Sequence, residues 1–221
     1  MTTVKIAFLL DCTGSMEEWI QTAKSKITEI VGRVLSDHID ADIQVGLVAY
    51  RDYDDHERFV IRDFTTPDEI RRVLGTIHAE GGDDAAEDVA HAIQQCSALS
   101  WGDADVRMVF HIADAPAHGL MFHKPSVSDR FPQGDPEGLD PRTVLRTMST
   151  HAFEYTFVKI TSATDTMLDA FYNAWTGPGF FQVIDLTPQS LMGRRANEVF
   201  SRQVSCAVSS AIDRSTSSRD T

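Results

Sequence analysis

The chain has 221 residues, a formal net charge of −13 and a sequence pI of about 4.9. Its 42% hydrophobic and 24% charged residues are typical of a globular protein, and this length suffices to bury one substantial core. An acidic chain repels phosphate backbones, which argues against general nucleic-acid binding, and no apolar run approaches the roughly 20 residues of a membrane span.

The three cysteines, Cys12, Cys96 and Cys206, are odd in number and widely spaced, so they predict no disulfide framework. A reducing compartment, the cytoplasm, is the expected location. The first apolar run leads into Asp11 and not into a small-residue cleavage site, which favours a core strand over a signal peptide.

The first elements in chain order are a strand at 4–10 and a helix at 16–35, in which Ser15 and Glu18 form a possible capping box. A second strand is expected at 43–50. The next run, 58–64, carries charged residues, which is typical of an antiparallel edge strand. In chain order, the remaining elements are expected as helices at 67–78 and 85–99, a strand at 106–113, an irregular segment at 119–140, a helix at 141–149, a strand at 153–160, a helix at 165–175, a strand at 180–186 and a final helix at about 189–212.

Most of these strands carry apolar residues on both of their alternating faces, as expected of parallel strands that helices cover on both faces. The alternation predicts a three-layer, doubly wound α/β fold with a mainly parallel, six-stranded sheet and one antiparallel edge strand. No change of composition marks a second domain. We expect one domain over residues 1–213 and a polar, disordered tail at 214–221.

Polar residues that follow the strands indicate a cation site, because ligands of open parallel sheets bind at the carboxyl ends of the strands. The segment Asp11-Cys12-Thr13-Gly14-Ser15 places a carboxylate and two hydroxyls between a strand and a helix. Such hard oxygen ligands suit Mg²⁺ or Mn²⁺. The alternative role for Ser15 is to cap the helix.

Two further segments are expected at the same edge of the sheet. Asp114 follows the strand at 106–113, and the glycine-rich loop at 81–88 contains Asp83 and Asp84. One of these two aspartates is expected to supply another oxygen, directly or through water, and the other to cap the following helix.

Four other residues are candidates for supporting roles. Arg51 and Asp52 follow the strand at 43–50 and could orient ligands of the metal, or belong to a solvated loop. Glu87 could do the same, although an acid in the first turn of a helix is favourable for its own sake. His118 could contact a partner, or bond to the backbone of its loop.

These motifs resemble those of the von Willebrand factor A domain. Asp11-x-Thr13-x-Ser15 is similar to the family's D-x-S-x-S metal motif, with Thr13 at the middle serine, and Asp114 resembles its second metal-site aspartate. DCTGSM, GLVAYRD, GGDDAAED and IADAPAHG together resemble the subgroup found beside alpha-kinase domains, and the resemblance covers roughly residues 4–212.

The resemblance implies a non-enzymatic module that binds Mg²⁺ or Mn²⁺ and uses it to bind a protein. A partner's acidic side chain would complete the coordination, as part of an alpha-kinase-related system. The common family pattern has a threonine in the second loop. The alpha-kinase-associated subgroup has a GGGD-type loop there, which favours Asp84 over Asp83.

An enzyme is the alternative. The segment Asp11-Cys12-Thr13-Gly14-Ser15 is also similar to the D-K-T-G-T motif of phosphoryl-transfer enzymes of the haloacid dehalogenase type, in which the aspartate, here Asp11, is a nucleophile and Mg²⁺ is required. Those enzymes also need a lysine near the site, and no lysine is expected at a suitable strand end.

Overall fold

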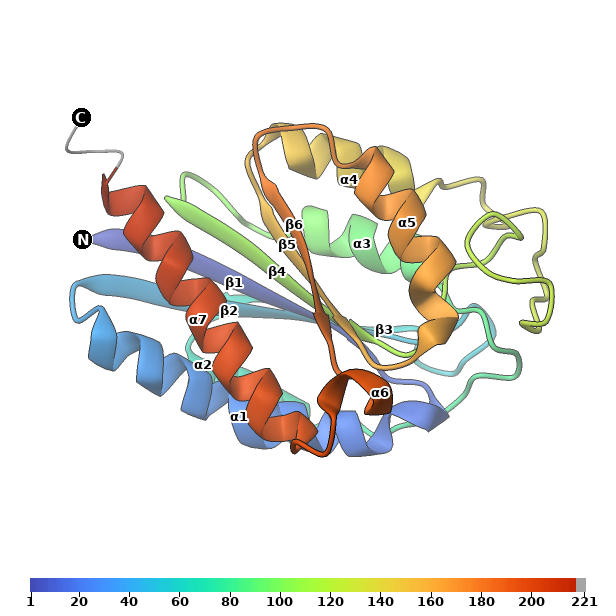
Figure 1. The fold of residues 1–221 in the computed structure, drawn as a ribbon, viewed down its shortest axis with the longest axis horizontal. Helices are drawn as coiled ribbons and strands as arrows, with labels where there is room; N and C mark the ends of the chain where they lie inside the picture. Colours follow the sequence, from blue (N-terminus) through green and yellow to red (C-terminus); the bar gives the residue numbers. More distant parts are fainter. Residues whose placement is uncertain (218–221) are drawn as a thin grey trace.

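The computed structural model describes residues 1–217, which form one twisted sheet between two layers of helices (Figure 1). The sheet has six strands in the order β3-β2-β1-β4-β5-β6, and β3 is its antiparallel edge strand. The strands are β1 Thr2–Asp11, β2 Ala41–Tyr50, β3 Phe59–Thr65, β4 Val106–Ala113, β5 Glu154–Lys159 and β6 Phe180–Asp185.

Strand β1 is central in the sheet, and this position explains why most of its residues are apolar. It pairs in parallel with β2 on one side and with β4 on the other. Because side chains alternate along a strand, Ile6 and Phe8 pack in one core while Ala7 and Leu9 pack in the other. Both faces of the strand are therefore buried, and its carboxyl end lies in the middle of one edge of the sheet.

The helices divide between the two faces. Helices α1, α2 and α7 cover one face, and α3, α4 and α5 cover the other (Figure 1). The helical elements are η1 Gly14–Met16, α1 Glu17–Asp37, α2 Pro67–Thr76, α3 Val89–Ser97, α4 Pro141–Thr150, η2 Ser162–Thr164, α5 Asp165–Ala174, α6 Pro188–Leu191 and α7 Ala196–Ser217. In residues 1–217, no helix has the length and apolar character needed to cross a membrane.

The architecture confirms the predicted fold class. The charged run at 58–64 is an edge strand, and its pairing with β2 changes register between Val45 and Leu47. Irregular pairing of this kind is a common feature of sheet edges.

Three local expectations are wrong. Helix α1 begins at Glu17, after the 3₁₀ turn Gly14–Met16, and neither element has a side-chain cap within the described chain. The expected capping role of Ser15 therefore does not hold, because its hydroxyl donates to Asp114 instead.

The final helix is broken where a continuous one was expected. Met192 adopts a left-handed conformation (φ 50°) and Gly193 follows with φ 84°, so the chain turns between α6 and α7. Helix α7 then continues to Ser217, and Arg214 pairs with both oxygens of Glu154 at 2.7 Å. The expectation of a disordered tail is wrong for residues 214–217, and residues 218–221 lie outside the described part of the chain.

Candidate metal centre

Asp11 ends strand β1 with its side chain fully buried. Its Oδ1 accepts hydrogen bonds from the backbone N–H of Thr13 at 2.9 Å and from the Thr13 hydroxyl at 2.7 Å. Its Oδ2 is buried and has no hydrogen-bond partner among residues 1–217. Because an unpartnered buried carboxylate oxygen is unfavourable, this oxygen needs a proton or a cation.

Asp114 lies beside Asp11, just beyond the end of the neighbouring parallel strand β4. It accepts a hydrogen bond from the Ser15 hydroxyl, and its Oδ1 is buried without a partner in the described chain. Burial, followed by the negative charge of Asp114, raises the pKa of Asp11 to about 7. Burial also raises the pKa of Asp114, against the opposing effect of the Ser15 hydrogen bond. Two adjacent carboxyl groups are thus held in a place that disfavours their negative charge.

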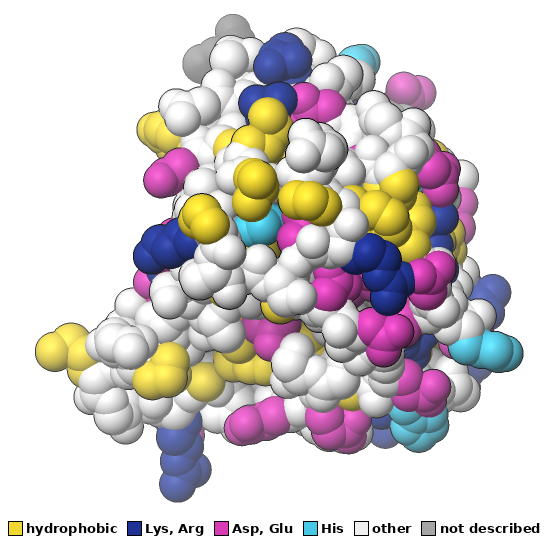
Figure 2. Space-filling model, turned by 90° about the vertical axis from the view of Figure 1, so that its right-hand side faces the viewer, with side chains coloured by type: hydrophobic (Ala, Val, Ile, Leu, Met, Phe, Trp, Pro, Cys, Tyr) yellow, Lys and Arg dark blue, Asp and Glu magenta, His cyan; other side chains and the backbone are white. Residues whose placement is uncertain are grey.

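An open pocket of about 590 Å³ lies at this edge of the sheet. Acidic side chains gather on this face of the molecule, and apolar side chains lie beside them (Figure 2). The side chains with oxygen ligands that line the pocket are Thr13, Ser15, Asp84, Glu87, Asp114, Thr161 and Ser162. The structure thus brings the two hydroxyls of the D-x-T-G-S segment together with carboxylates from two other loops.

The two aspartates of the glycine-rich loop have different surroundings. Asp83 is exposed and lies 3.5 Å from the guanidinium of Arg130. Asp84 is half-buried and lines the pocket. The backbone N–H of Arg130 donates to its Oδ2 at 2.6 Å, while its Oδ1 is buried without a partner within residues 1–217. Of the two, Asp84 has the free oxygen that could serve a ligand.

Glu87 is the residue that the sequence analysis undervalued. Helix α3 begins at Val89 and is capped by Asp88, so Glu87 precedes the helix and does not lie in its first turn. Its side chain is buried, and its Oε2 has no partner in the described part of the chain. Burial, followed by the charge of Asp11, raises the pKa of Glu87 to about 10. The alternative of an acid in the first turn of a helix is therefore wrong, and Glu87 is a buried side chain that lines the pocket.

Two glycines allow this loop to lie against the site. Gly81 and Gly82 both have positive φ, 81° and 85°. A Cβ on Gly81 would lie 1.9 Å from Oδ1 of Asp55, and a Cβ on Gly82 would lie 3.2 Å from Oε1 of Glu87. Only glycine accommodates this conformation and this closeness together.

Arg51 and Asp52 are both buried, so the alternative of a solvated loop is wrong for them. The guanidinium of Arg51 donates to the backbone carbonyls of Glu57 and His78, at 2.7 and 2.8 Å. Arg51 thereby supports two loops of the site edge. Asp52 lies 2.8 Å from Nε2 of His118.

His118 is buried between Asp52 and Asp129, with 2.8 Å to each. Its ring is closed off from solvent, which does not fit the expected contact with a partner. Burial alone lowers its pKa, but the two carboxylates raise it to about 9. No motif pointed to Asp129, which lies in the irregular segment 119–140.

The residues present fit a divalent cation. Asp11, Asp84, Glu87 and Asp114 each keep one buried carboxylate oxygen without a partner in residues 1–217, and the hydroxyls of Thr13 and Ser15 lie among them. Oxygen-only ligands are those that Mg²⁺ and Mn²⁺ prefer, and a cation would offset the mutual repulsion of the carboxylates.

Comparisons with known proteins agree with this geometry. The family model described as von Willebrand factor A domain matches residues 5–126. The chain is 33% identical over 171 residues to the alpha-protein kinase vwkA of Dictyostelium discoideum, and the match covers 76% of this chain and 27% of that kinase. The chain thus spans about a quarter of the length of this curated relative.

Solved structures show the same fold. The open conformation of the pilus adhesin SpaC from Lactobacillus rhamnosus GG superposes with a TM-score of 0.64 at 11% identity, covering 94% of this chain and 30% of that one. The SpRpn10 VWA domain superposes with a TM-score of 0.58 at 12% identity, covering 90% and 94%. The chain belongs to the von Willebrand factor A domain family, whose members are generally non-enzymatic protein-interaction modules, and it is of the alpha-kinase-associated type.

Proposed function

We propose that this domain holds Mg²⁺ or Mn²⁺ at Asp11, Thr13, Ser15 and Asp114, and that it uses the ion to bind an acidic side chain of a partner protein. The observation that carries the proposal is the pair of buried, unpartnered oxygens on Asp11 and Asp114, within the described residues. Both lie where two hydroxyls are also available.

The residues would have distinct roles. Asp11 and Asp114 supply negative charge, and Thr13 and Ser15 supply neutral oxygens. Glu87 and Asp84, which line the same pocket, bind the ion directly or through water. Because the pocket is open, a partner's carboxylate can reach the ion from solvent, and the bound ion supplies the positive charge that attracts it.

The phosphoryl-transfer alternative is not favoured. Lys159 does end strand β5, contrary to the expectation that no lysine lies at a suitable strand end. Its ammonium group is engaged by Asp165 at 2.6 Å and by Asp185 at 3.3 Å. Lys159 is thus paired with two carboxylates other than Asp11 and is not available for the role that such a mechanism requires.

The likeness to vwkA supports a place in an alpha-kinase-related system, in which the domain recruits or regulates and catalysis lies elsewhere. The matched region covers 27% of that kinase, so the kinase activity of that protein is not carried over to this domain. The thiols of Cys12, Cys96 and Cys206 are free, which supports the expected cytoplasmic location.

The test is thermal unfolding in EDTA and then with Mg²⁺, Mn²⁺ or Ca²⁺, for the wild type, Asp11→Asn and the matched control Asp169→Asn, which changes an exposed aspartate of α5. An ion that binds only the folded state raises its stability. We expect Mg²⁺ or Mn²⁺ to raise the melting temperature of the wild type and of the control, and to leave the melting temperatures of Asp11→Asn and Asp11→Ala unchanged.

A second measurement tests the partner. Peptides that present one aspartate or glutamate are titrated onto the Mg²⁺-loaded protein and onto the protein in EDTA. Binding that needs both the ion and the peptide carboxylate supports the proposal. Equal binding in EDTA, or equal ion stabilisation of Asp11→Asn, would overturn it.

A further inference from the structure

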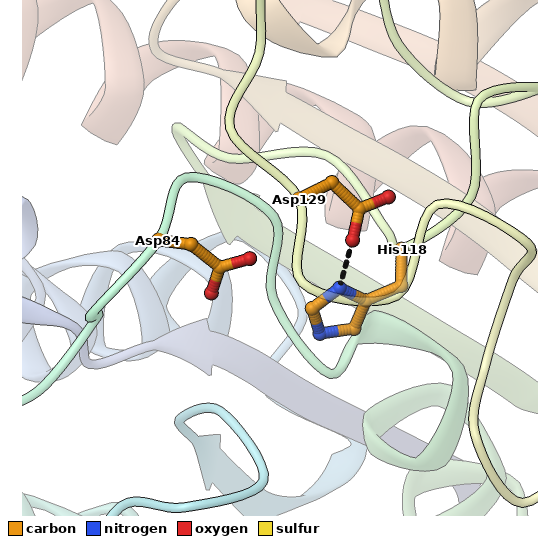
Figure 3. Close-up of side chains that lie close together, drawn as sticks. All are labelled: Asp84, His118 and Asp129. Atoms are coloured by element: carbon orange, nitrogen blue, oxygen red, sulfur yellow. Dashed lines mark hydrogen bonds and ion pairs between the residues drawn. The ribbon is translucent and has the colours of Figure 1, made fainter.

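A second cluster of ligand groups lies next to the pocket, around the buried ring of His118 (Figure 3). Three segments supply it: Asp52 from the loop after β2, Asp84 from the glycine-rich loop, and His118 with Asp129 from the region after β4. Ligand atoms of Asp84, His118 and Asp129 all lie within 4.8 Å of one another. Unlike the site at Asp11, this cluster offers a nitrogen.

Asp129 is already saturated with donors. Its Oδ1 accepts from the backbone N–H of Phe131 at 2.7 Å and lies 2.8 Å from Nδ1 of His118. Its Oδ2 accepts from the backbone N–H of Gly119 at 2.8 Å and lies 2.8 Å from Nε2 of His123. A carboxylate has about four acceptor positions, so Asp129 is not available as a metal ligand. Its effect is to orient the His118 ring and hold its Nδ1 proton.

The opposite nitrogen faces two other carboxylates. Nε2 of His118 lies 2.8 Å from Oδ1 of the buried Asp52. Burial raises the pKa of Asp84, and the negative charge of the nearby Asp52 acts in the same direction. Asp84 also has a buried oxygen without a partner in the described chain. This side of the ring therefore has more acceptors than donors.

We propose that Asp52, Asp84 and Nε2 of His118 form a second cation site that binds Zn²⁺, beside the site at Asp11 and Asp114 and sharing Asp84 with it. Zn²⁺ accepts imidazole nitrogen together with carboxylate oxygen as ligands, whereas Mg²⁺ prefers oxygen alone. The Asp129–His118 hydrogen bond then matches the usual arrangement in which a carboxylate orients a metal-binding histidine.

The ligand spacing is compatible with an ion. Zinc bonds to nitrogen and oxygen are about 2.0–2.2 Å long, so two ligand atoms on one tetrahedral ion lie about 3.3–3.6 Å apart. Nε2 of His118 and Oδ1 of Asp52 are 2.8 Å apart and would separate by roughly 0.5 Å or more to hold the ion. Binding replaces the proton on Nε2 of His118, which is released to solvent. Asp84 lines the open pocket, which provides the route for the ion.

A similar cluster at Asp88, His91 and Asp135 provides a matched control. There the guanidinium of Arg58 lies 2.6 Å from Asp88, and the Tyr53 hydroxyl donates to Asp135. An arginine thus already balances the charge that would attract an ion. The two clusters resemble each other in composition and differ in this cation.

The experiment is calorimetric titration of Zn²⁺ into Asp11→Asn, a background in which the first site is disabled. We expect one equivalent of Zn²⁺ to bind. Adding His118→Gln or Asp52→Asn should weaken binding by more than tenfold, and adding Asp129→Asn by about 10- to 100-fold. Adding His91→Gln should change nothing. Absence of binding in Asp11→Asn, insensitivity to His118→Gln, or an equal loss with His91→Gln would overturn the proposal.

A measurement on the unsubstituted protein covers the case in which His118→Gln does not fold. Long-range ¹H–¹⁵N NMR spectra report the protonation of each histidine ring, and His118 is assigned by its contact with the Phe131 ring, 5.0 Å away. One equivalent of Zn²⁺ should convert His118 from a doubly protonated ring to one protonated at Nδ1 only. A ring that stays doubly protonated with Zn²⁺ in excess would contradict the assignment, whatever Mg²⁺ does at Asp11.

Discussion

Asp11 and Asp114 follow neighbouring parallel strands, β1 and β4, and each holds one carboxylate oxygen that is buried without a partner among residues 1–217. The pairing register of the two strands places Leu10 opposite Ile112, so β1 and β4 end side by side at the same edge of the sheet. Two carboxylates that are 103 positions apart in the sequence therefore lie next to each other and can bind the same ion.

The stability of the metal-free protein should fall as the pH rises. Asp11 loses its proton near pH 3.8 when unfolded and near pH 7 when folded, so the folded state binds more protons between these values. Stability is then full below pH 3.8 and is lost toward pH 7, by at most about 1.4 kcal/mol per pH unit. Chemical denaturation in EDTA between pH 4.5 and 7.5 measures this fall.

The matched variant for this prediction is Asp11→Asn, whose side-chain oxygen can still accept from Thr13 but which does not ionise. We expect a shallower slope than in the wild type, with a remaining slope from Glu87, whose pKa is also raised. Identical slopes for the wild type and the variant would show that Asp11 does not carry the effect.

The affinity for Mg²⁺ should increase with pH. A cation competes with the proton on Asp11, and this competition ends once the pH exceeds about 7. Calorimetry at pH 6 and pH 8 should show tighter binding at pH 8, together with proton release at pH 6. Affinity that is constant over this range would mean that the ion does not displace the Asp11 proton.

Glu87→Gln should separate cation binding from folding. The pKa of about 10 means that metal-free Glu87 is already neutral at pH 7, so the isosteric amide should leave stability in EDTA nearly unchanged. Cation affinity should fall by about tenfold or more, since an amide cannot supply the negative charge. Unfolding in EDTA and a Mg²⁺ titration on the same protein measure the two effects, and unchanged affinity would remove Glu87 from the site.

Gly81→Ala should destabilise the loop beside the site. The new Cβ would meet the carboxylate of Asp55, and the residue would keep a φ of 81° that alanine disfavours. A cost of about 1–3 kcal/mol is expected. Gly32→Ala is the control of opposite sign, because this glycine lies in helix α1 with open space around it and alanine favours helix by about 0.5–1 kcal/mol. Urea unfolding of the two variants tests both signs.

The local pattern of apolar residues was sufficient to predict the three layers of the fold and the two aspartates at the centre of the site. The apolar runs predict the strands because a parallel sheet covered on both faces demands them, and Asp11 and Asp114 follow from those strand ends. The same reasoning misplaced the start of helix α3 by four residues, which concealed that Glu87 precedes the helix and is buried at the site.

Only the tertiary structure decided which polar groups lie beneath the pocket. Asp52, Asp84, His118 and Asp129 come from segments that no periodicity connects, and the irregular segment 119–140 carries Asp129 back to the sheet edge. Their burial and contacts depend on how these loops pack against one another. The local apolar pattern of a sequence determines where its strands end. Which loops contact one another depends on long-range packing, and the local pattern does not encode that packing.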